Sequence, residues 1–195
     1  YVIYTDGCLV VDAATGKTVK TFKLPAVDGK SPVWGSIRIQ GDYLVAAIQP
    51  VPGRLARLTK RGAKRPIQGD VYSTSSKYLV VMNRLTGKVL WQREAKQNFR
   101  HNAIAVNKDT VFCLDRMSDE RIAMRKERDE TTPPGRALLA LGLSDGKVRW
   151  QTDKDIFGTF LSYSEEFDYL IQSTSKNRDR ATDEAKSGAA VYRAK

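Results

Sequence analysis

The sequence predicts an all-β protein made of repeated four-stranded antiparallel sheets. Three observations lead to this prediction: short apolar runs rich in β-branched and aromatic residues, polar turns between them, and an eleven-residue pattern that occurs three times. Apolar runs of this length and composition are typical of strands and are too brief for helices. A repeated unit of this kind determines the architecture of the whole chain.

The repeated pattern joins two strands through a turn that ends in Gly-Lys. Asn or Asp at the start of such a turn can accept hydrogen bonds from the backbone that follows, and the glycine can take the positive φ that closes a hairpin. Each copy therefore predicts one hairpin. The copies are VVDAATGKTVK at 10–20, VMNRLTGKVLW at 81–91 and ALGLSDGKVRW at 140–150.

A second apolar pair around a polar turn follows each copy. Two hairpins complete one four-stranded sheet with two apolar faces, so neighbouring sheets have to stack face to face. Radial stacking of about three such sheets predicts a partial β-propeller. The second pairs are GSIRIQGDYLVAA at 35–47, NAIAVNKDTVFCL at 102–114 and GTFLSYSEEFDYLIQ at 158–172.

Both ends of the chain carry apolar segments that belong to further units. Residues 1–4 are expected to close a preceding unit, and AAVY at 189–192 is expected to open the next. Closed propellers contain roughly four to eight sheets. We therefore expect residues 1–195 to be a fragment of a single propeller domain, with an eight-bladed ring as the hypothesis for the whole.

Two tryptophans stand at the same place in successive copies, Trp91 and Trp150. A flat ring there can fill the gap between neighbouring sheets, while its indole N–H donates to a backbone oxygen of the adjoining turn. Core packing is favoured over a cofactor-binding role. The residues predicted to dock the sheets are Asp12, Gly16, Asn83, Gly87, Trp91, Gly146 and Trp150.

The spacing of a small or apolar residue, Asp or Asn, Gly and Trp resembles a known motif. It is similar to the tryptophan-docking repeat of the quinoprotein-type β-propellers, the pyrroloquinoline-quinone-like (PQQ-like) repeat family. Lys20 replaces the tryptophan in the first copy, and Gly142 replaces the Asp or Asn in the third. The matching residues are Asp12 and Gly16, then Val81, Asn83, Gly87 and Trp91, and finally Ala140, Gly146 and Trp150.

The resemblance implies two alternative functions, because one fold hosts many activities. The first is a non-enzymatic scaffold for protein or ligand binding that needs no cofactor, similar to the propeller lipoprotein that assists β-barrel insertion into the outer membrane. The second is a fragment of a PQQ-dependent alcohol or sugar dehydrogenase. In those enzymes PQQ lies over a tryptophan, under a disulfide between adjacent cysteines, and beside a calcium ion bound by Glu and Asn and a catalytic Asp.

The cysteines favour the scaffold. The chain has two of them, Cys8 and Cys113, and they are not adjacent. We expect both to be small buried apolar residues. The missing blades could hold the quinone site, so the dehydrogenase stays open as the alternative. The resemblance also implies an extracytoplasmic location, in the periplasm or cell envelope.

Two long insertions and one linker interrupt the units. The insertion at about 49–77 is rich in Pro and Gly and predicts an irregular loop. The insertion at about 115–136 contains DERIAMRKERDE at 119–130, which is compatible with one short helix. Residues 174–188 form a polar linker. Loops on rigid scaffolds often carry function, and long insertions also arise by drift, so both readings stay open. If the segments are functional, protein partners are expected to bind them.

The net charge of +11 raises the question of a polyanionic partner. The excess is concentrated between Arg54 and Lys77, where seven basic residues accompany the single acid Asp70. The basic–aromatic interleaving of single-strand binders is absent there, so a solvated loop is favoured over nucleic-acid binding through Arg54–Arg65. No apolar run approaches the roughly 18 residues that a membrane helix requires.

The one histidine, His101, lies between Arg100 and Asn102 at the mouth of a hairpin. A cation, a titratable ring and an amide side by side could contact an anionic ligand at the centre of the propeller, with Trp34 at the matching place of the first unit. A capping or hydrogen-bonding role is favoured over catalysis. The sequence assigns no catalytic, cofactor-binding or metal-binding residue.

Overall fold

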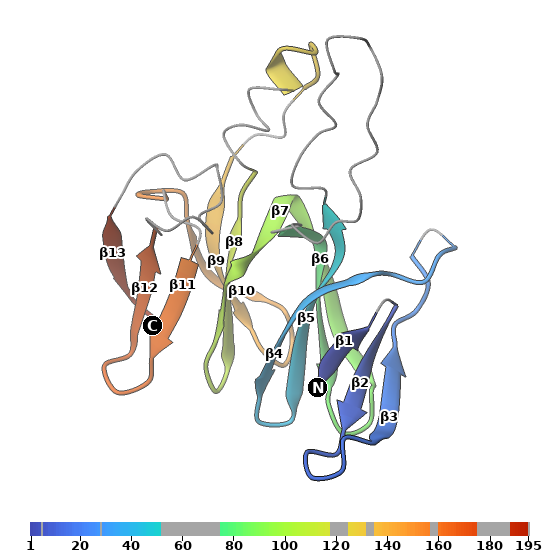
Figure 1. Ribbon diagram of the computed structural model, residues 1–195. Helices are drawn as coiled ribbons and strands as arrows, with labels where there is room; N and C mark the ends of the chain where they lie inside the picture. The colour runs from blue at the N-terminus through green and yellow to red at the C-terminus, as the bar shows by residue number, and fades with distance from the viewer. Residues whose placement is uncertain are drawn as a thin grey trace.

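The computed structural model describes residues 1–4, 6–27, 29–51, 75–117, 125–131, 135–156, 160–174 and 188–194. Strands within these ranges form three antiparallel sheets, none of them closed (Figure 1). The predicted all-β class is confirmed. Arg125 and Lys126 form one helical turn, and residues 119–124 of the expected helix lie outside the described residues. In the part of the chain that is described, no helix could cross a bilayer.

The three sheets follow one another along the chain. The first has the order β1-β2-β3, the second β10-β9-β8-β7-β6-β5-β4 and the third β11-β12-β13. The strands are β1 Val2–Tyr4, β2 Gly7–Val11, β3 Thr18–Lys23, β4 Trp34–Gln40, β5 Tyr43–Val51, β6 Ser75–Asn83, β7 Val89–Val106, β8 Thr110–Asp115, β9 Ala137–Gly142, β10 Val148–Thr152, β11 Phe160–Ser164, β12 Tyr169–Ser173 and β13 Ala189–Arg193.

The seven-stranded sheet consists of two halves that share the 18-residue strand β7. The first part of β7, up to Arg100, pairs with β6, and its last part, Ile104–Val106, pairs with β8. The register shifts between Phe99 and Ile104, where the strand passes from one partner to the other.

The sequence analysis grouped each repeat hairpin with the apolar pair that follows it and assigned residues 1–4 and 189–192 to further units, and this grouping is wrong. Instead, β5 pairs with β6 and β8 with β9, so a repeat hairpin joins the pair that precedes it, while β1 pairs with β2 and β13 with β12. The two four-stranded halves also form one sheet and not separate sheets. The two join because the chain stays extended through the connection between them.

Successive layers pack through three apolar clusters, which we call the first, second and third junctions. Neighbouring residues of a strand point to opposite faces, so β5, β6, β8 and β9 each contribute to two junctions. The first lies between β1–β3 and the β4–β7 half, the second between the halves, and the third between the β7–β10 half and β11–β13. The first contains Cys8, Phe22, Ile48 and Met82, the second Val45, Val81, Val111 and Leu141, and the third Phe112, Leu138, Leu161 and Leu170.

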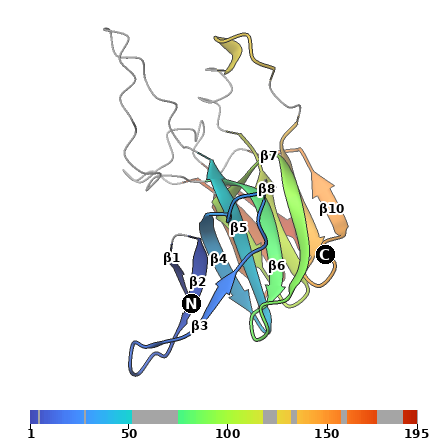
Figure 2. The same ribbon diagram turned by 90° about the vertical axis from the view of Figure 1, so that its right-hand side faces the viewer.

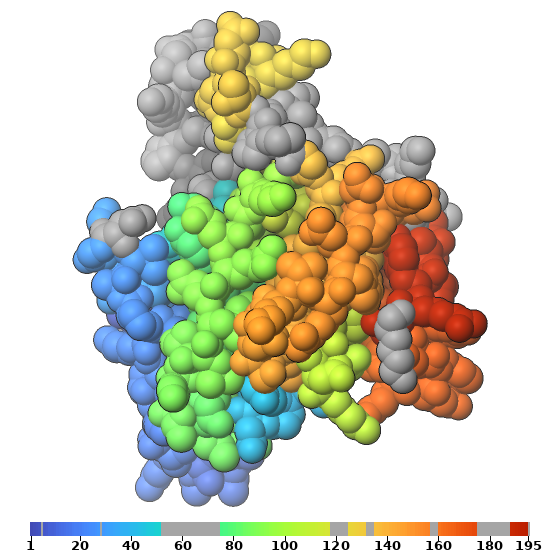
Figure 3. Space-filling model, turned by 180° about the vertical axis from the view of Figure 1, so that it is seen from behind, coloured from blue at the N-terminus to red at the C-terminus, as the bar shows by residue number. Residues whose placement is uncertain are grey.

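The layers stand side by side in chain order, as Figure 3 shows from behind. Both cysteines are free and buried, which confirms that they act as small apolar residues. Cys8 belongs to the first junction and Cys113 to the second. Burial raises the pKa of both thiols, so neither is an activated nucleophile.

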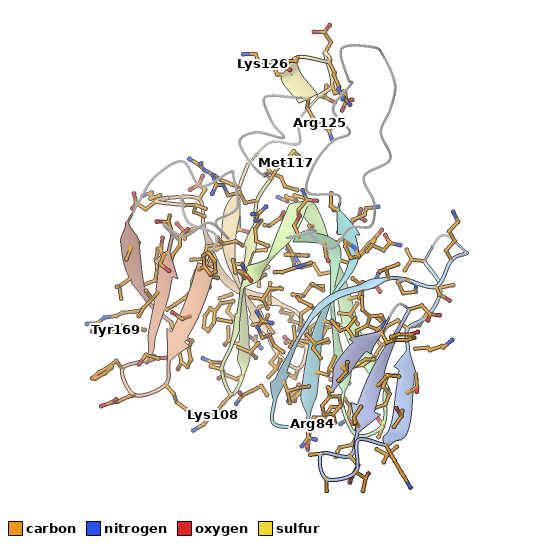
Figure 4. The ribbon with its side chains drawn as sticks, in the orientation of Figure 1. Arg84, Lys108, Met117, Arg125, Lys126 and Tyr169 are labelled. Atoms are coloured by element: carbon orange, nitrogen blue, oxygen red, sulfur yellow. The ribbon has the colours of Figure 1, made fainter. Side chains whose placement is uncertain are left out.

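The two edges of this stack differ in character (Figures 1 and 2). One edge, the turn edge, carries the short reversals at 12–17, 41–42, 83–88, 107–109, 142–147 and 165–168. The other, the loop edge, carries the short reversal between β1 and β2 and the connections between β3 and β4, β5 and β6, β8 and β9, β10 and β11, and β12 and β13. Figure 4 shows Arg84 and Lys108 at the turn edge, and Met117, Arg125 and Lys126 at the opposite end.

Both predicted insertions leave from the loop edge, and the strands continue into them. Val51 pairs with Ser75 and Asp115 pairs with Ala137, so each insertion is closed at its base by a strand pair. Residues 52–74, with the basic run Arg54–Arg65, lie outside the described residues, as do 118–124 and 132–134. Residues 175–187 of the polar linker also lie outside them.

Candidate functional site

The Gly-Lys turns at the turn edge share one hydrogen-bond pattern in the first two copies. Asn83 Oδ1 accepts hydrogen bonds from the backbone N–H groups of Leu85 and Thr86 at 3.0 and 2.9 Å. Asp12 Oδ1 accepts the equivalent bonds at 3.1 and 2.7 Å. Bonds from the side chain and then the backbone of Thr15 hold the pKa of Asp12 below its usual value. The side chain thus organises the turn locally, as turn residues of this type do.

The third copy organises its turn with a different residue. A Cβ at Gly142 would meet the carboxylate of Asp145 and the guanidinium of Arg149. Asp145 Oδ1 accepts a hydrogen bond from the backbone N–H of Lys147 at 3.1 Å, and Arg149 Nη2 lies 3.2 Å from the carboxylate. The backbone bond from Gly146 N–H to the Gly142 carbonyl, at 2.8 Å, matches those of the other copies. Asp145 therefore fills the space that Asp or Asn occupies elsewhere.

Two tryptophans join neighbouring layers. Trp91 Nε1 donates to the backbone oxygen of Leu143 at 2.9 Å across the second junction. Its ring lies on Gly146, with Cδ2 2.7 Å from the point where a Cβ would stand. Trp150 Nε1 donates to the backbone oxygen of Ala194 at 3.0 Å across the third junction. Each ring fills apolar space while its N–H is satisfied, as buried tryptophan requires.

The first junction is joined by other residues, because Lys20 stands where the repeat has tryptophan. The ring of Phe22 lies on Gly87, with Cδ1 2.7 Å from a Cβ position there. Lys20 Nζ donates to the backbone oxygen of Leu85 at 2.6 Å and stands 4.8 Å from the centroid of the Phe22 ring. An aromatic ring and a separate cationic donor thus occupy the place of one tryptophan.

Of the residues predicted to contact a ligand, His101 has described partners near the loop edge, where it approaches Gly35 of β4 and Ser76 of β6. His101 Nε2 lies 2.7 Å from Ser76 Oγ, and a Cβ at Gly35 would stand 2.6 to 2.7 Å from those two atoms. The glycine after Trp34 is thus required by the close approach of His101. Arg38 Nη2 donates to the His101 backbone oxygen at 3.1 Å, and burial lowers the pKa of Arg38.

The four predicted contacts differ in exposure. Trp34 and Arg100 are buried, His101 is half-buried and Asn102 is exposed. Trp34 belongs to the first junction, and its Nε1 has no hydrogen-bond partner among the described residues. His101 lies against Gly35, the residue after Trp34, whereas Arg100 pairs opposite Ser75 in the strand register. The four side chains therefore do not present one common exposed surface.

Asp115 is a buried residue at the loop edge that the sequence analysis did not single out. Its Oδ2 accepts the backbone N–H of Lys96 at 2.6 Å and its Oδ1 that of Gln97 at 2.7 Å, in the stretch of β7 where the register with β6 shifts. Burial raises the pKa of Asp115, and the backbone hydrogen bonds partly oppose this. The carboxylate thus satisfies two backbone N–H groups in the irregular part of β7. A charged residue at the end of the buried run VFCLD was the available signal.

A hollow of about 280 Å³ lies beside Asp115. Its lining combines cationic and anionic side chains, including Lys96, Arg136 and Asp153. Within the described ranges, no group of three or more His, Cys, Asp or Glu side chains is placed to hold a metal ion. The described residues therefore do not offer the clustered carboxylates that a calcium site would use.

Comparisons with known proteins bear on the fold alone. No family model and no curated protein matches the chain. Among solved structures, the chain is similar to the computationally designed Ika4 protein, with a TM-score of 0.55, 12% identity, and coverage of 98% of this chain and 82% of that one. It is also similar to the computationally designed Ika8 protein, with a TM-score of 0.52, 12% identity, and coverage of 96% and 40%.

Proposed function

We propose that this chain is part of a β-propeller of PQQ-like repeats, and that it acts as a non-enzymatic scaffold whose loop edge binds protein partners. The observation that carries the proposal is the difference between the two edges. Every reversal at the turn edge is short, whereas all three predicted long segments lie between strands at the loop edge. Binding surfaces commonly form on loops that a rigid framework positions.

The junctions supply that framework. The strands that flank both insertions, β5 with β6 and β8 with β9, carry most of the fully buried apolar residues of the core. Each of these strands packs on both faces, so the bases of the insertions are held on two sides. Such packing allows the loops to vary in sequence without loss of the fold.

The proposal is tested by cross-linking from matched positions on the two edges. A photoreactive amino acid replaces Lys126 at the loop edge in one variant and Lys108 at the turn edge in the other, as labelled in Figure 4. Both side chains are exposed. In cells that produce the protein, we expect a discrete protein adduct from position 126 and none from position 108. Equal adducts from both, or adducts from 108 alone, would contradict the proposal.

A reconstitution experiment distinguishes the dehydrogenase alternative from the scaffold. The whole protein is incubated with calcium and PQQ, and the reduction of a dye by an alcohol or sugar is followed. The scaffold is expected to give no reduction above that of free PQQ. Dye reduction that depends on the protein would show that the protein is a dehydrogenase and that the scaffold proposal is wrong.

Two further expectations accompany the scaffold. An extracytoplasmic location is tested by fractionation of the same cells. A polyanion contact through Arg54–Arg65 would weaken steeply between low and moderate salt, because phosphate contacts release counterions. Binding of a nucleic acid that does not weaken in this way would exclude that contact.

A further inference from the structure

The first junction is filled with apolar side chains where it reaches the loop edge. Leu24, Ile48 and Tyr78 all belong to it, with exposed fractions of 8%, 0% and 9%. Ile48 and Tyr78 are partners in the register of β5 and β6, so their side chains lie on one face of the sheet. We call these three residues the apolar plug of the first junction.

The repeat shows which residues stand at the same places in the second junction. Leu24 stands eight residues after the glycine of its turn, Tyr78 stands nine residues before the turn glycine of the next sheet, and Ile48 is the strand partner of Tyr78. The same spacings and pairing, one unit further on, replace Leu24 by Ala95, Tyr78 by Ala137 and Ile48 by Asp115. The hollow of about 280 Å³ is lined in part by the last two of these. It therefore lies where the plug stands in the first junction.

The buried carboxyl group beside this hollow is costly to the fold. Asp115 is 5% exposed, and burial raises its pKa, which means that the surrounding protein disfavours the charged form. Ile48 shows that the framework accepts an apolar residue at the same place. The second junction thus has a desolvated carboxyl group and open space where close packing was available. This combination is typical of functional sites.

The charges around the hollow define the chemistry of a ligand. Lys96 and Arg136 are exposed lining residues, and Asp153 adds a second carboxylate to that of Asp115. A ligand with a single positive charge would meet both basic side chains, and one with a single negative charge would meet both carboxylates. A molecule that carries a charge of each sign can satisfy both kinds of group.

The carboxylate of Asp115 has room for a donor from such a molecule. It accepts hydrogen bonds from the backbone N–H groups of Lys96 and Gln97, and a third from that of Asn98. A carboxylate offers about four acceptor positions. An ammonium group in the hollow would therefore add a charge-assisted hydrogen bond without displacing the backbone donors.

The size of the hollow limits the ligand to a small one, because sites for drug-sized molecules begin at about 300 Å³. We propose that the hollow binds a free amino acid, with its ammonium group on Asp115 and its carboxylate on Lys96 and Arg136. This inference goes beyond the proposed function, which concerns protein partners of the insertions.

Binding is tested by NMR on the full chain. Each of the common amino acids is added in turn, and the amide resonances of Lys96 and Gln97 are followed, because these N–H groups bond the carboxylate that would receive the ammonium. We expect a saturable shift with at least one amino acid, while the amide of Gly41 at the turn edge stays unshifted. The amine and the carboxylic acid that each carry one of the two charged groups should bind far more weakly. No saturable shift with any amino acid, or equal binding of the amine or the acid alone, would overturn the proposal.

Substitution of the carboxylate locates the site. Asp115→Asn keeps the size of the side chain and should weaken binding about tenfold, because a hydrogen bond between charged groups is lost. Asp12→Asn is the matched control, since Asp12 lies in a turn at the opposite edge, and it should leave the affinity unchanged. Equal affinities of the two variants would show that the amino acid binds elsewhere.

The first junction supplies a further variant. Ala95→Leu, Asp115→Ile and Ala137→Tyr together install the apolar plug in the second junction, and we expect this variant to bind no amino acid. If it folds and still binds, the hollow is not the site. If it does not fold, Asp115→Asn decides. Neither result alters the cross-linking expected from position 126, so this inference and the proposed function can fail separately.

Discussion

The first and second junctions perform the same task with different residues. At the second, Trp91 supplies both the ring on Gly146 and the N–H that reaches the Leu143 oxygen. At the first, Phe22 supplies the ring on Gly87 and Lys20 the donor. What the two have in common is the glycine turn. The comparison teaches that the turn is the constant part of the docking site, whereas the groups that fill it can be divided between two side chains.

The largest expected effect comes from removing either ring. Trp91→Ala and Phe22→Ala should each lower the free energy of unfolding by about 3 kcal/mol, because a large aromatic side chain is lost from a packed junction. Trp91→Phe keeps a smaller ring, so it should cost less than Trp91→Ala: about 1 kcal/mol for the lost hydrogen bond, in addition to the loss of part of the indole packing. Urea denaturation of the four proteins measures this. If Trp91→Ala costs no more than Trp91→Phe, the ring does not join the layers.

The glycines give the second test. Alanine at positive φ costs roughly 1 kcal/mol wherever it stands. At Gly146 the added methyl would also displace Trp91, so Gly146→Ala should destabilise the protein by about 2 kcal/mol more than Gly16→Ala, where the space is open. Thermal unfolding of both variants provides the measurement. Equal losses would show that the contact with the ring carries no energy.

A third test uses pH. The pKa of Asp115 at the loop edge is raised, whereas that of Asp12 at the turn edge is lowered. The folded-state pKa of Asp115 is raised by burial, so the stability that depends on it falls as pH rises from about 4 through that pKa. The pKa of Asp12 is lowered by its turn, so its contribution is present above about 4 and is lost as pH falls below it. Denaturation between pH 3 and pH 7 should show both trends in the native chain.

Substitution separates the two carboxylates. Asp115→Asn should remove the fall in stability on the alkaline side of that window, and Asp12→Asn should remove the loss on the acid side. Each replacement serves as the control for the other. A pH profile that Asp115→Asn leaves unchanged would show that the buried carboxyl group does not titrate with unfolding.

The smallest expected effect belongs to Lys20. Its bond to the Leu85 oxygen is exposed to solvent, so Lys20→Met should change the free energy of unfolding by less than about 0.5 kcal/mol. Chemical denaturation at low and high salt measures the change. A loss comparable to that of Phe22→Ala would show that the ammonium group, and not the ring, holds the first junction.

The structure also shows which sequence patterns were informative. The repeat predicted the hairpins β2–β3, β4–β5, β6–β7, β7–β8, β9–β10 and β11–β12, because the strand pattern and the turn residues are local in sequence. It did not predict that β1 pairs with β2, β5 with β6, β8 with β9 or β12 with β13. The breaks in that repeat were not interpretable from the pattern alone. The presence of Lys20 at the tryptophan position does not indicate that the ring of Phe22 packs on Gly87 instead. Likewise, Gly142 does not indicate that the Asp145 side chain occupies the place of Asp or Asn in the turn. In both cases a side chain from another position in the sequence substitutes for the missing one, and the direction in which that side chain points is known only from the folded structure.

The candidate site near the loop edge was predicted less well. The sequence analysis named Trp34 as the residue at the matching place of the first unit. In the structure the neighbouring Gly35 lies against His101, whereas Trp34 is buried in the first junction. Ser76 and Arg38, which contact His101, were not identified. They lie 25 and 63 residues from it in the chain, and nothing in the pattern of either strand marks a residue that bonds across to another sheet position.

The amino-acid sequence by itself determined the strands, the hairpins and the glycine turns. These depend on alternating apolar side chains and on hydrogen bonds between residues two or three positions apart, such as Asn83 with Thr86. Only the tertiary structure decided that β7 joins two halves into one sheet, and which ring covers which glycine. Those contacts join residues such as Trp91 and Leu143, 52 positions apart, which meet only when whole sheets stack and exclude water between them.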